Sequence, residues 1–259
     1  MAIKLGIISD PISGFNIKKD TGFAMMMQAQ KRGYEIYYME MDDLSLRQGK
    51  SYATAAKAQV FNNTEKWYEL EEKTTIALAD LDVILMRKDP PFDTEYIYAT
   101  YILERAEQEG TLIINKPQSL RDANEKLFTA WFSEHTPDTL VTRSQAQIRA
   151  FLAEHKDIIL KPLDGMGGAS IFRIKEDDAN IGVICETLTE HGSRFAMVQN
   201  YIPEIKQGDK RVLVVDGEVI PYCLARIPQN GETRGNLAAR GRGEARPLSE
   251  SDLKIAQAV

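Results

Sequence analysis

The chain has 259 residues, enough to bury a sizeable core in one large domain or two smaller ones. Its composition, 43% hydrophobic and 27% charged, is that of an ordinary globular protein, and its net charge of −6 does not favour general affinity for nucleic acid. No apolar run approaches a membrane span, the N-terminus lacks a signal region, and two distant cysteines do not form a disulfide framework. We therefore expect a protein of the reducing cytoplasm that binds neither a membrane nor nucleic acid.

Residues 3–40 predict a strand, a helix and a second strand. The apolar run at 3–9 is followed by a helix that Asp20 or Thr21 can cap and that Gly33 ends, and residues 34–40 form the next strand. In such a βαβ unit the strands are parallel, and ligands bind beyond their carboxyl ends. No G-x-G-x-x-G motif follows the first strand, so a dinucleotide site is not indicated.

Residues 44–79 predict an antiparallel meander, because turn signals at 49–50 and 62–63 separate weakly alternating runs. Residues 83–86 (VILM) predict a buried strand, and Arg87 stands at its carboxyl end, before two prolines. That position suits the carboxylate of a substrate. The alternative is a solvated arginine on a rigid loop.

A helix capped by Asp93 or Thr94 and a short strand at 112–114 are expected to complete this part of the chain. A domain boundary is expected near residues 115–118.

Beyond that boundary, Ser119 can cap a turn, and a helix is expected over residues 124–132. A strand is predicted at 139–142, and Ser144 can cap a helix that ends near His155.

The most distinctive stretch is IILKPLDGMGGASIFRI, residues 158–174, which predicts a strand, a glycine-rich turn and a second strand. The turn contains Gly165, Met166, Gly167 and Gly168. Glycines let several backbone N–H groups point at one ligand, which suits a phosphate, and Lys161 would add a compact positive charge. The alternative is a tight hairpin with an exposed lysine.

The remaining elements are a helix at 180–191, a strand at 195–200, a hairpin of 211–215 with 218–226 around Asp216-Gly217, and a final helix opened by Ser249. Because the chain stops inside that helix, we expect it to be incomplete.

Residues 227–247 contain four glycines and four arginines but few large apolar residues, so they cannot pack well as core. A basic, glycine-rich loop in an acidic protein is a candidate lid over an anion. The alternative is a flexible surface loop.

Histidines and cysteines do not indicate a site. The three histidines, His135, His155 and His191, have no ligand spacing and are expected at helix ends or on the surface. Cys185 and Cys223 are expected to be core thiols.

Several motifs together resemble the bacterial glutathione synthetase family of the ATP-grasp superfamily. They are IKKD (17–20), VILMRKDPPFDTEYIYATYILERA (83–106), NKPQSLRDANEKLFTAWF (115–132), ILKPLDGMGGASIFR (159–173), GDKRVLVVDGE (208–218) and YCLARIPQNGETRGNLAARGRGE (222–244).

The resemblance implies an α/β chain, α+β overall, with the ATP-grasp fold behind a doubly wound pre-ATP-grasp domain. The expected domains are an N-terminal α/β domain (1–120), a lid subdomain (121–202) and the start of the C-terminal subdomain (203–259), with ATP between the last two.

The resemblance also implies the chemistry. The family joins γ-glutamylcysteine to glycine with ATP and Mg²⁺ or Mn²⁺. ATP phosphorylates the cysteinyl carboxylate, the glycine amine attacks the acyl phosphate, and phosphate leaves, which divides one hard step into two easier ones. Members of the family are homotetramers.

By motif position, Lys126 and Lys161 would hold the ATP phosphates, and the backbone of the glycine-rich turn would cover them. The other implied residues are Gln199, Asn200, Tyr201 and Ile202 at adenine, Asp209 at the ribose, Arg211, Arg226 and Arg234 at the reacting groups, Asn236 at the nucleotide, and Arg87 at a substrate carboxylate.

The chain departs from the family pattern in two places. The family's acidic and Asn ligands for magnesium follow the last helix, so no metal ligand is expected within residues 1–259, and the activity of this chain is expected to be weak. Arg240 replaces a glycine in the predicted lid, where it could stiffen the loop or add a phosphate contact.

Two other hypotheses stay open from the sequence. One is a different ATP-grasp carboxylate–amine ligase, such as a D-alanine–D-alanine ligase or a peptide-tailing ligase, although these lack the MRKDPPFD stretch. The other is a non-catalytic nucleotide-binding remnant that ends at Val259.

Overall fold

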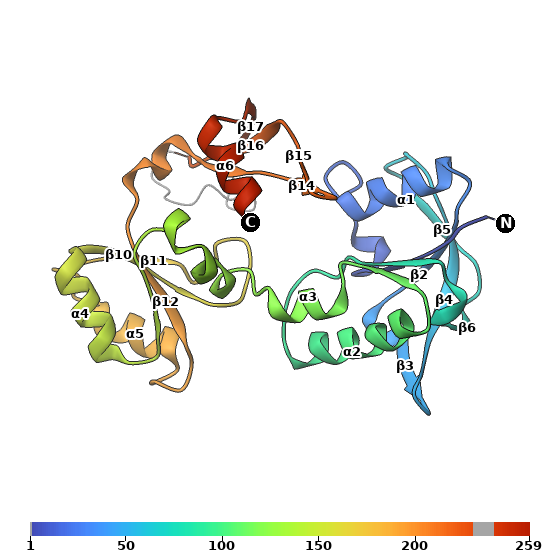
Figure 1. Ribbon diagram of the computed structural model, residues 1–259, viewed down its shortest axis with the longest axis horizontal. Helices are drawn as coiled ribbons and strands as arrows, with labels where there is room; N and C mark the ends of the chain where they lie inside the picture. The colour runs from blue at the N-terminus through green and yellow to red at the C-terminus, as the bar shows by residue number, and fades with distance from the viewer. Residues whose placement is uncertain (1, 230–240) are drawn as a thin grey trace. The chain divides into compact units, whose positions relative to one another are not determined.

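The computed structural model describes residues 2–229 and 241–259, and the chain divides into two compact units, Met1–Ala123 and Asn124–Val259 (Figure 1). Each unit has its own sheet and its own core. The predicted division of the second unit at residue 203 stays a prediction.

The N-terminal unit is built on a mixed sheet in the order β3-β4-β2-β1-β7-β8, with β5 and β6 also paired to β4. Its parallel part contains β1 (Lys4–Ile8), β2 (Glu35–Met39), β7 (Val83–Met86) and β8 (Leu112–Ile114). All four strands were predicted from their apolar runs, and the βαβ interpretation is confirmed because β1 and β2 pair in parallel.

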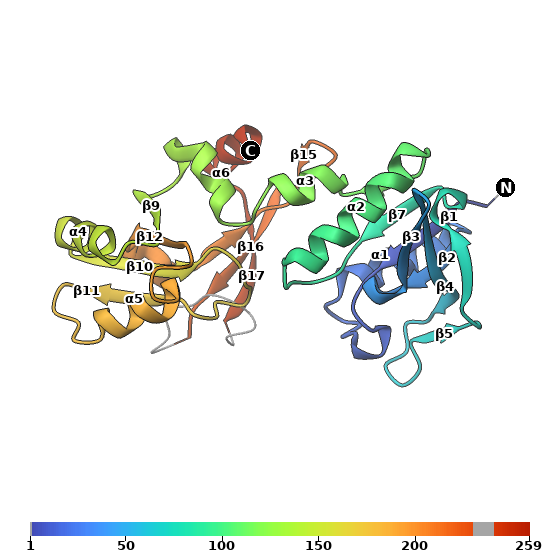
Figure 2. The same cartoon turned by 90° about the horizontal axis from the view of Figure 1, so that it is seen from below.

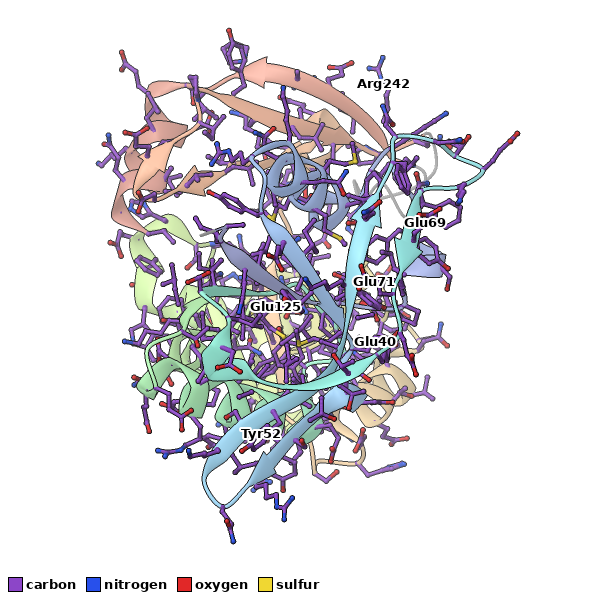
Figure 3. All side chains as sticks on the ribbon, turned by 90° about the vertical axis from the view of Figure 1, so that its right-hand side faces the viewer. Glu40, Tyr52, Glu69, Glu71, Glu125 and Arg242 are labelled. Atoms are coloured by element: carbon purple, nitrogen blue, oxygen red, sulfur yellow. The ribbon has the colours of Figure 1, made fainter. Side chains whose placement is uncertain are left out.

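The antiparallel strands predicted between β2 and β7 are confirmed, but they do not follow one another as a simple meander, because β5 and β6 both pair with β4. The strands are β3 (Leu44–Arg47), β4 (Lys50–Val60), β5 (Tyr68–Leu70) and β6 (Thr74–Ala77), and β4 pairs antiparallel with each of the other three. Glu69 and Glu71 lie exposed at β5, which pairs with β4 on one side (Figure 3). Charges on such a strand discourage pairing with another chain.

Three helices accompany this sheet: α1 (Thr21–Lys31), α2 (Thr94–Gln108) and α3 (Pro117–Asp122). Asp20 caps α1 by accepting a hydrogen bond from the N–H of Phe23 at 2.7 Å, which confirms one of the two predicted caps. The prediction that Ser119 caps a turn is wrong. Lys116 is the N-cap residue of α3, and Pro117 occupies the first turn, where its missing N–H costs no intrahelical bond.

The sheet is buried on both faces because alternate residues of each strand point to opposite sides. On β1, Leu5 and Ile7 pack with α1, whereas Ile8 packs with the core that includes α2. A parallel sheet covered in this way needs the near-continuous apolar runs that the sequence contains.

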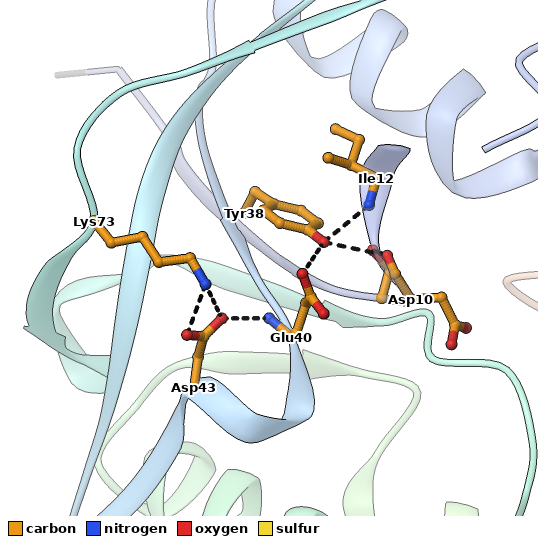
Figure 4. A network of polar contacts seen from close by, with 7 residues as sticks. Asp10, Ile12, Tyr38, Glu40, Asp43 and Lys73 are labelled. Atoms are coloured by element: carbon orange, nitrogen blue, oxygen red, sulfur yellow. Dashed lines mark hydrogen bonds and ion pairs between the residues drawn. The ribbon is translucent and has the colours of Figure 1, made fainter. Parts of the chain in front are cut away.

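A buried tyrosine joins the loops at the carboxyl ends of β1 and β2 (Figure 4). The hydroxyl of Tyr38, 1% exposed, accepts a hydrogen bond from the N–H of Ile12 at 3.0 Å and lies 2.8 Å from a carboxylate oxygen of Glu40. Burial, and then Glu40, raise the pKa of Tyr38 well above its usual range. The neutral hydroxyl thus acts as both donor and acceptor, and it fixes the loop that follows β1.

The C-terminal unit begins with an antiparallel sheet in the order β11-β10-β12-β9. Its strands are β9 (Thr139–Thr142), β10 (Asp157–Pro162), β11 (Phe172–Lys175) and β12 (Ala196–Asn200). Helices α4 (Gln145–His155) and α5 (Ile181–Thr189) cover one face, as Figures 1 and 2 show. The core between them includes Ile158, Leu160 and Ile174.

The rest of this unit contains a sheet in the order β13-β16-β17 and a two-stranded hairpin. The strands are β13 (Asp209–Arg211), β14 (Val214–Val215), β15 (Glu218–Val219), β16 (Tyr222–Ile227) and β17 (Arg242–Pro247), and α6 (Glu250–Ala258) follows. The Ser249 capping box of α6 is confirmed.

Two predictions for this unit are wrong in detail. The turn at Asp216-Gly217 is present, but only β14 and β15 form its hairpin, whereas Arg211 lies in β13 and pairs with β16. Instead of a helix over 124–132, Leu127–His135 is a 3₁₀ segment that includes non-helical backbone at Phe132. The side chain of Asn124 accepts from the N–H groups of Lys126 and Leu127 and so caps the start of this segment.

We predict that Tyr38→Phe lowers the free energy of unfolding by about 1–3 kcal/mol, because the buried N–H of Ile12 loses its acceptor. Urea unfolding would measure the change, and Tyr98→Phe, at a tyrosine 54% exposed, is the matched control. If both variants unfold at the wild-type urea concentration, the Tyr38 network does not stabilise the unit.

Candidate functional site

The first group of the candidate site is a chain of polar side chains across three strands of the C-terminal unit. Lys161 Nζ donates to Gln199 Oε1 at 2.7 Å, and Gln199 Nε2 donates to Thr139 Oγ1 at 2.9 Å. The three residues lie on β10, β12 and β9, and in the register Gln199 stands opposite Thr139.

Strand alternation explains why these side chains share a face. Leu160 and Val198 point into the core beneath α4 and α5, so their neighbours Lys161 and Gln199 point to the opposite face, which those helices do not cover. The apolar pattern that builds the core therefore also aims the polar residues away from it.

The glycine-rich turn, residues 163–171, connects β10 to β11. Gly165, Gly167 and Gly168 have φ values of +89°, +70° and +80°, which residues with a Cβ rarely adopt. Space alone does not explain Gly165, since a Cβ there would meet no atom within 4 Å. The turn thus needs glycine for its backbone conformation, as a loop that presents N–H groups to an anion does.

The second predicted lysine is tied to this turn. Lys126 Nζ donates to the carbonyl of Gly165 at 2.8 Å and pairs with Glu125 at 2.9 Å. Burial lowers the pKa of Lys161, and the positive charge of Lys126 lowers it further. The structure therefore brings Lys126, Lys161 and the glycine-rich turn together. The positive charges of the two lysines repel each other.

The segment 199–202, predicted to meet adenine, contains the last two residues of β12 and the two residues that follow it. The N–H of Asn200 donates to Asp138 O at 3.3 Å, and the N–H of Tyr201 donates to Asp157 O at 2.9 Å. Asn200 Oδ1 and the Tyr201 hydroxyl are buried yet make no hydrogen bond within the described part of the chain. Ile202 is 45% exposed.

The residues predicted at the ribose and the reacting groups lie on one face of the β13–β16 pair. Asp209 stands opposite Arg226 in the register, and the Arg226 guanidinium donates two hydrogen bonds to its carboxylate, one of them 2.9 Å long. Arg211 is exposed on the same face of β13. Gly208 is required here, because a Cβ would come within 2.9 Å of Arg226 O.

Three predicted residues fall outside the described residues: Arg234, Asn236 and Arg240. The roles inferred for them stay predictions.

Arg87 lies in the N-terminal unit, exposed at the carboxyl end of β7 as predicted. Its N–H donates to Ile8 O at 2.7 Å, which extends the pairing with β1 by one residue. Asp10, just beyond β1, pairs with Lys88 at 2.8 Å and accepts from the N–H of Asp89 at 3.0 Å. These bonds fix the loop that carries Arg87 and leave its side chain accessible to a ligand.

Histidines and cysteines behave largely as predicted. His155 is the last residue of α4, and both cysteines are buried and free. One grouping was not expected: ligand atoms of Asp138, Glu154 and His155 lie within 4.8 Å of one another. The Nε2 atom of His155 lies 3.1 Å from Asp138 Oδ2.

The sequence did not indicate two arginines, Arg194 and Arg173, that hold the elements around the site in place. Arg194 pairs with Asp164 at 2.6 Å and so anchors the start of the glycine-rich turn, and Arg173 pairs with Asp157 beside Tyr201. The alternation of 170–174 placed Arg173 on a strand but said nothing about its partners, because these depend on which strands pair.

An antiparallel sheet with a lysine, a glycine-rich turn and a second lysine held to that turn is the arrangement of an ATP-grasp ligase. Structural similarity supports this fold. D-cycloserine synthetase DcsG aligns over 98% of this chain and 79% of its own, with a TM-score of 0.66 and 16% identity. D-alanyl-alanine synthetase A from Vibrio cholerae aligns over 99% and 78%, with a TM-score of 0.57 and 13% identity. Identities this low establish the fold alone.

The sequence defines the family within that class. The models described as "Prokaryotic glutathione synthetase, N-terminal domain" and "Prokaryotic glutathione synthetase, ATP-grasp domain" match residues 3–121 and 125–259. The glutathione synthetase of Escherichia coli K12 is 70% identical over 257 residues, which are 99% of this chain and 81% of that protein. That of Salmonella typhimurium is 71% identical over 99% and 82%. The chain belongs to the prokaryotic glutathione synthetase family.

No helix among the described residues is long and apolar enough to cross a membrane.

We predict that Lys126→Met raises the pKa of the Lys161 amine, because the variant removes a nearby positive charge. NMR titration of the Lys161 side chain would measure the shift. Lys175→Met, at an exposed residue of the same unit, should leave that pKa unchanged. An unaltered Lys161 titration in Lys126→Met would show that the two ammonium groups do not interact.

Proposed function

We propose that the chain is an ATP-dependent ligase that joins γ-glutamylcysteine to glycine and forms glutathione, ADP and phosphate. Identity of about 70% to glutathione synthetases over nearly the whole chain carries the choice of substrates. The other ATP-grasp ligases that resemble the fold are only 12–17% identical, and no specific observation favours their substrates.

The arrangement of the two lysines is the observation that supports the proposed nucleotide site. Two ammonium groups beside one glycine-rich turn repel each other, and an anion between them would relieve that repulsion. A polyphosphate would relieve this repulsion. Lys126 and Lys161 would bind its oxygens, and the backbone N–H groups of residues 165–168 would cover it.

The segment 199–202 is proposed to receive adenine. Backbone groups of the segment would meet the edge of the base. The side chain of Asn200 stands opposite the core residue Ile158 and so points to the helix-covered face, away from Lys161. Asp209, partly exposed beside Arg226, would accept from the ribose hydroxyls.

The proposed reaction has two steps. The cysteinyl carboxylate of γ-glutamylcysteine attacks the γ-phosphorus of ATP, the bond to ADP breaks, and an acyl phosphate forms. The glycine amine then attacks the carbonyl carbon, a proton leaves the nitrogen, and phosphate departs. The protein contributes mainly positioning and charge, with Arg211 and Arg226 facing the transferring phosphoryl group and the oxyanion.

Mg²⁺ or Mn²⁺ is expected from the resemblance, and it would supply positive charge that offsets the negative charge of the phosphates. The one cluster of possible ligands in the described residues does not fit that task. Asp138, Glu154 and His155 combine two exposed carboxylates with an imidazole nitrogen, whereas Mg²⁺ prefers oxygen ligands. No step is assigned to this cluster.

Other parts of the proposal rest on motif positions. Arg87 would bind a substrate carboxylate, and Arg234 and Asn236 would reach the nucleotide with the lid loop, which would keep water from the acyl phosphate. The homotetramer and the cytoplasmic location stay predictions.

We predict that the protein releases phosphate from MgATP only when γ-glutamylcysteine and glycine are both present, because glycine must intercept the acyl phosphate to complete the reaction. A phosphate-release assay that omits each substrate in turn would measure this. D-alanine in place of glycine is the control for amine specificity. Equal release with D-alanine would reject the substrate assignment.

We predict that Lys161→Met weakens ATP binding by at least about tenfold, since one charge-assisted contact to phosphate is lost. Calorimetric titration would measure the dissociation constant, with Lys175→Met as the matched loss of an exposed charge. Wild-type affinity in Lys161→Met would place the phosphates elsewhere.

A further inference from the structure

Arg173 makes the most specific set of contacts in the C-terminal unit that the proposed mechanism does not use. Its guanidinium donates to both carboxylate oxygens of Asp157, at 2.9 and 2.6 Å. It also lies over the ring of Tyr201, 3.6 Å from the centroid. A planar guanidinium can make a two-pronged ion pair along its edge and stack through its face at the same time.

These three residues lie on one face of the sheet. In the register, Asp157 stands opposite Lys175 and Arg173 opposite Ile159, so Asp157 and Arg173 are diagonal neighbours on β10 and β11. Lys161 is on the same face, because it is an even number of residues from Asp157 along β10. Arg173 is thus on the side of the sheet that carries the proposed nucleotide site.

Tyr201 is the point at which β12 leaves the sheet. The β10–β12 ladder ends where Ile158 stands opposite Asn200, and beyond it the N–H of Tyr201 donates to Asp157 O at 2.9 Å. The chain then turns into the 3₁₀ segment Pro203–Gln207. Asp157 therefore holds Tyr201 twice, directly through its backbone and indirectly through Arg173.

We propose that Arg173 is a positioning residue for the nucleotide base: with Asp157 it clamps Tyr201 and so holds the segment 199–202 in the conformation that receives adenine. The proposal rests on the proposed function, because it takes the adenine site to be this segment. A segment held before the ligand arrives loses less conformational freedom on binding. The clamp does not touch the phosphates, so its effect falls on recognition of the base.

The Asp157 carboxylate is the main reason that the pKa of Arg173 is raised, so the guanidinium keeps its positive charge.

The test compares ATP and GTP binding, by calorimetry in the presence of Mg²⁺, for wild type, Arg173→Gln and Arg173→Lys. We expect Arg173→Gln to raise the dissociation constant for ATP about tenfold, with little change for GTP, so that selectivity for adenine falls. Arg173→Lys keeps the positive charge but loses the planar guanidinium that pairs with both Asp157 oxygens and stacks on Tyr201. Its dissociation constant for ATP should therefore lie between those of wild type and Arg173→Gln.

Glu176→Gln is the matched control. Glu176 pairs with Lys156 at 2.6 Å, next to the same two strands, but the pair has no contact with Tyr201 among the described residues. This variant should bind both nucleotides as wild type does. Thermal unfolding of each variant would separate a loss of stability from a loss of base recognition.

Two results would overturn the role of Arg173 while leaving the proposed function intact. One is Arg173→Gln that binds ATP within about twofold of wild type. The other is an equal loss of ATP and GTP affinity together with a lowered unfolding temperature, which would mean that Arg173 only stabilises the sheet. A wild-type protein that binds neither nucleotide would instead reject the proposed function itself.

Discussion

The placement of two lysine ammonium groups beside one glycine-rich turn is the constraint on which the candidate site depends. Lys161 is partly buried, and its charge is balanced by the carbonyl dipole of Gln199, whereas Lys126 is held by the carbonyl of Gly165 and by Glu125. Burial and the second charge both lower the pKa of Lys161, so the unit tolerates an unfavourable electrostatic arrangement. Such sites are characteristic of functional positions, since a bound anion removes the cost.

The antiparallel sheet makes this arrangement possible. Its two faces have different environments: α4 and α5 bury one, and the polar residues of β10, β11 and β12 occupy the other. Each apolar residue that points into the core determines the direction of its neighbour. Lys161, Gln199 and the Arg173–Asp157 pair therefore share a face as a consequence of how the core is packed.

The N-terminal unit positions its candidate residue by other means. The parallel strands β1 and β7 end at the same edge of the sheet, and the loops beyond them are held by the Asp10 contacts and by the buried hydroxyl of Tyr38 (Figure 4). Arg87 thus projects from a rigid frame. A residue on such a frame can bind a carboxylate with less loss of conformational freedom than one on a mobile loop.

The sequence by itself determined the elements whose signals are local. The strands at 83–86, 112–114 and 139–142, and the caps Asp20, Asp93, Ser144 and Ser249, depend on apolar periodicity or on hydrogen bonds within a few residues. The family motifs likewise selected Lys126 and Lys161 as the two residues at the ATP phosphates.

Only the tertiary structure decided the contacts that join distant segments. The pairing of β13 with β16 placed Asp209 against Arg226, and the pairing of β10 with β11 placed Arg173 beside Asp157 and Tyr201. Local patterns cannot specify such pairs, because a strand signal is the same whichever strand it pairs with. The partner is chosen by the packing of the whole unit.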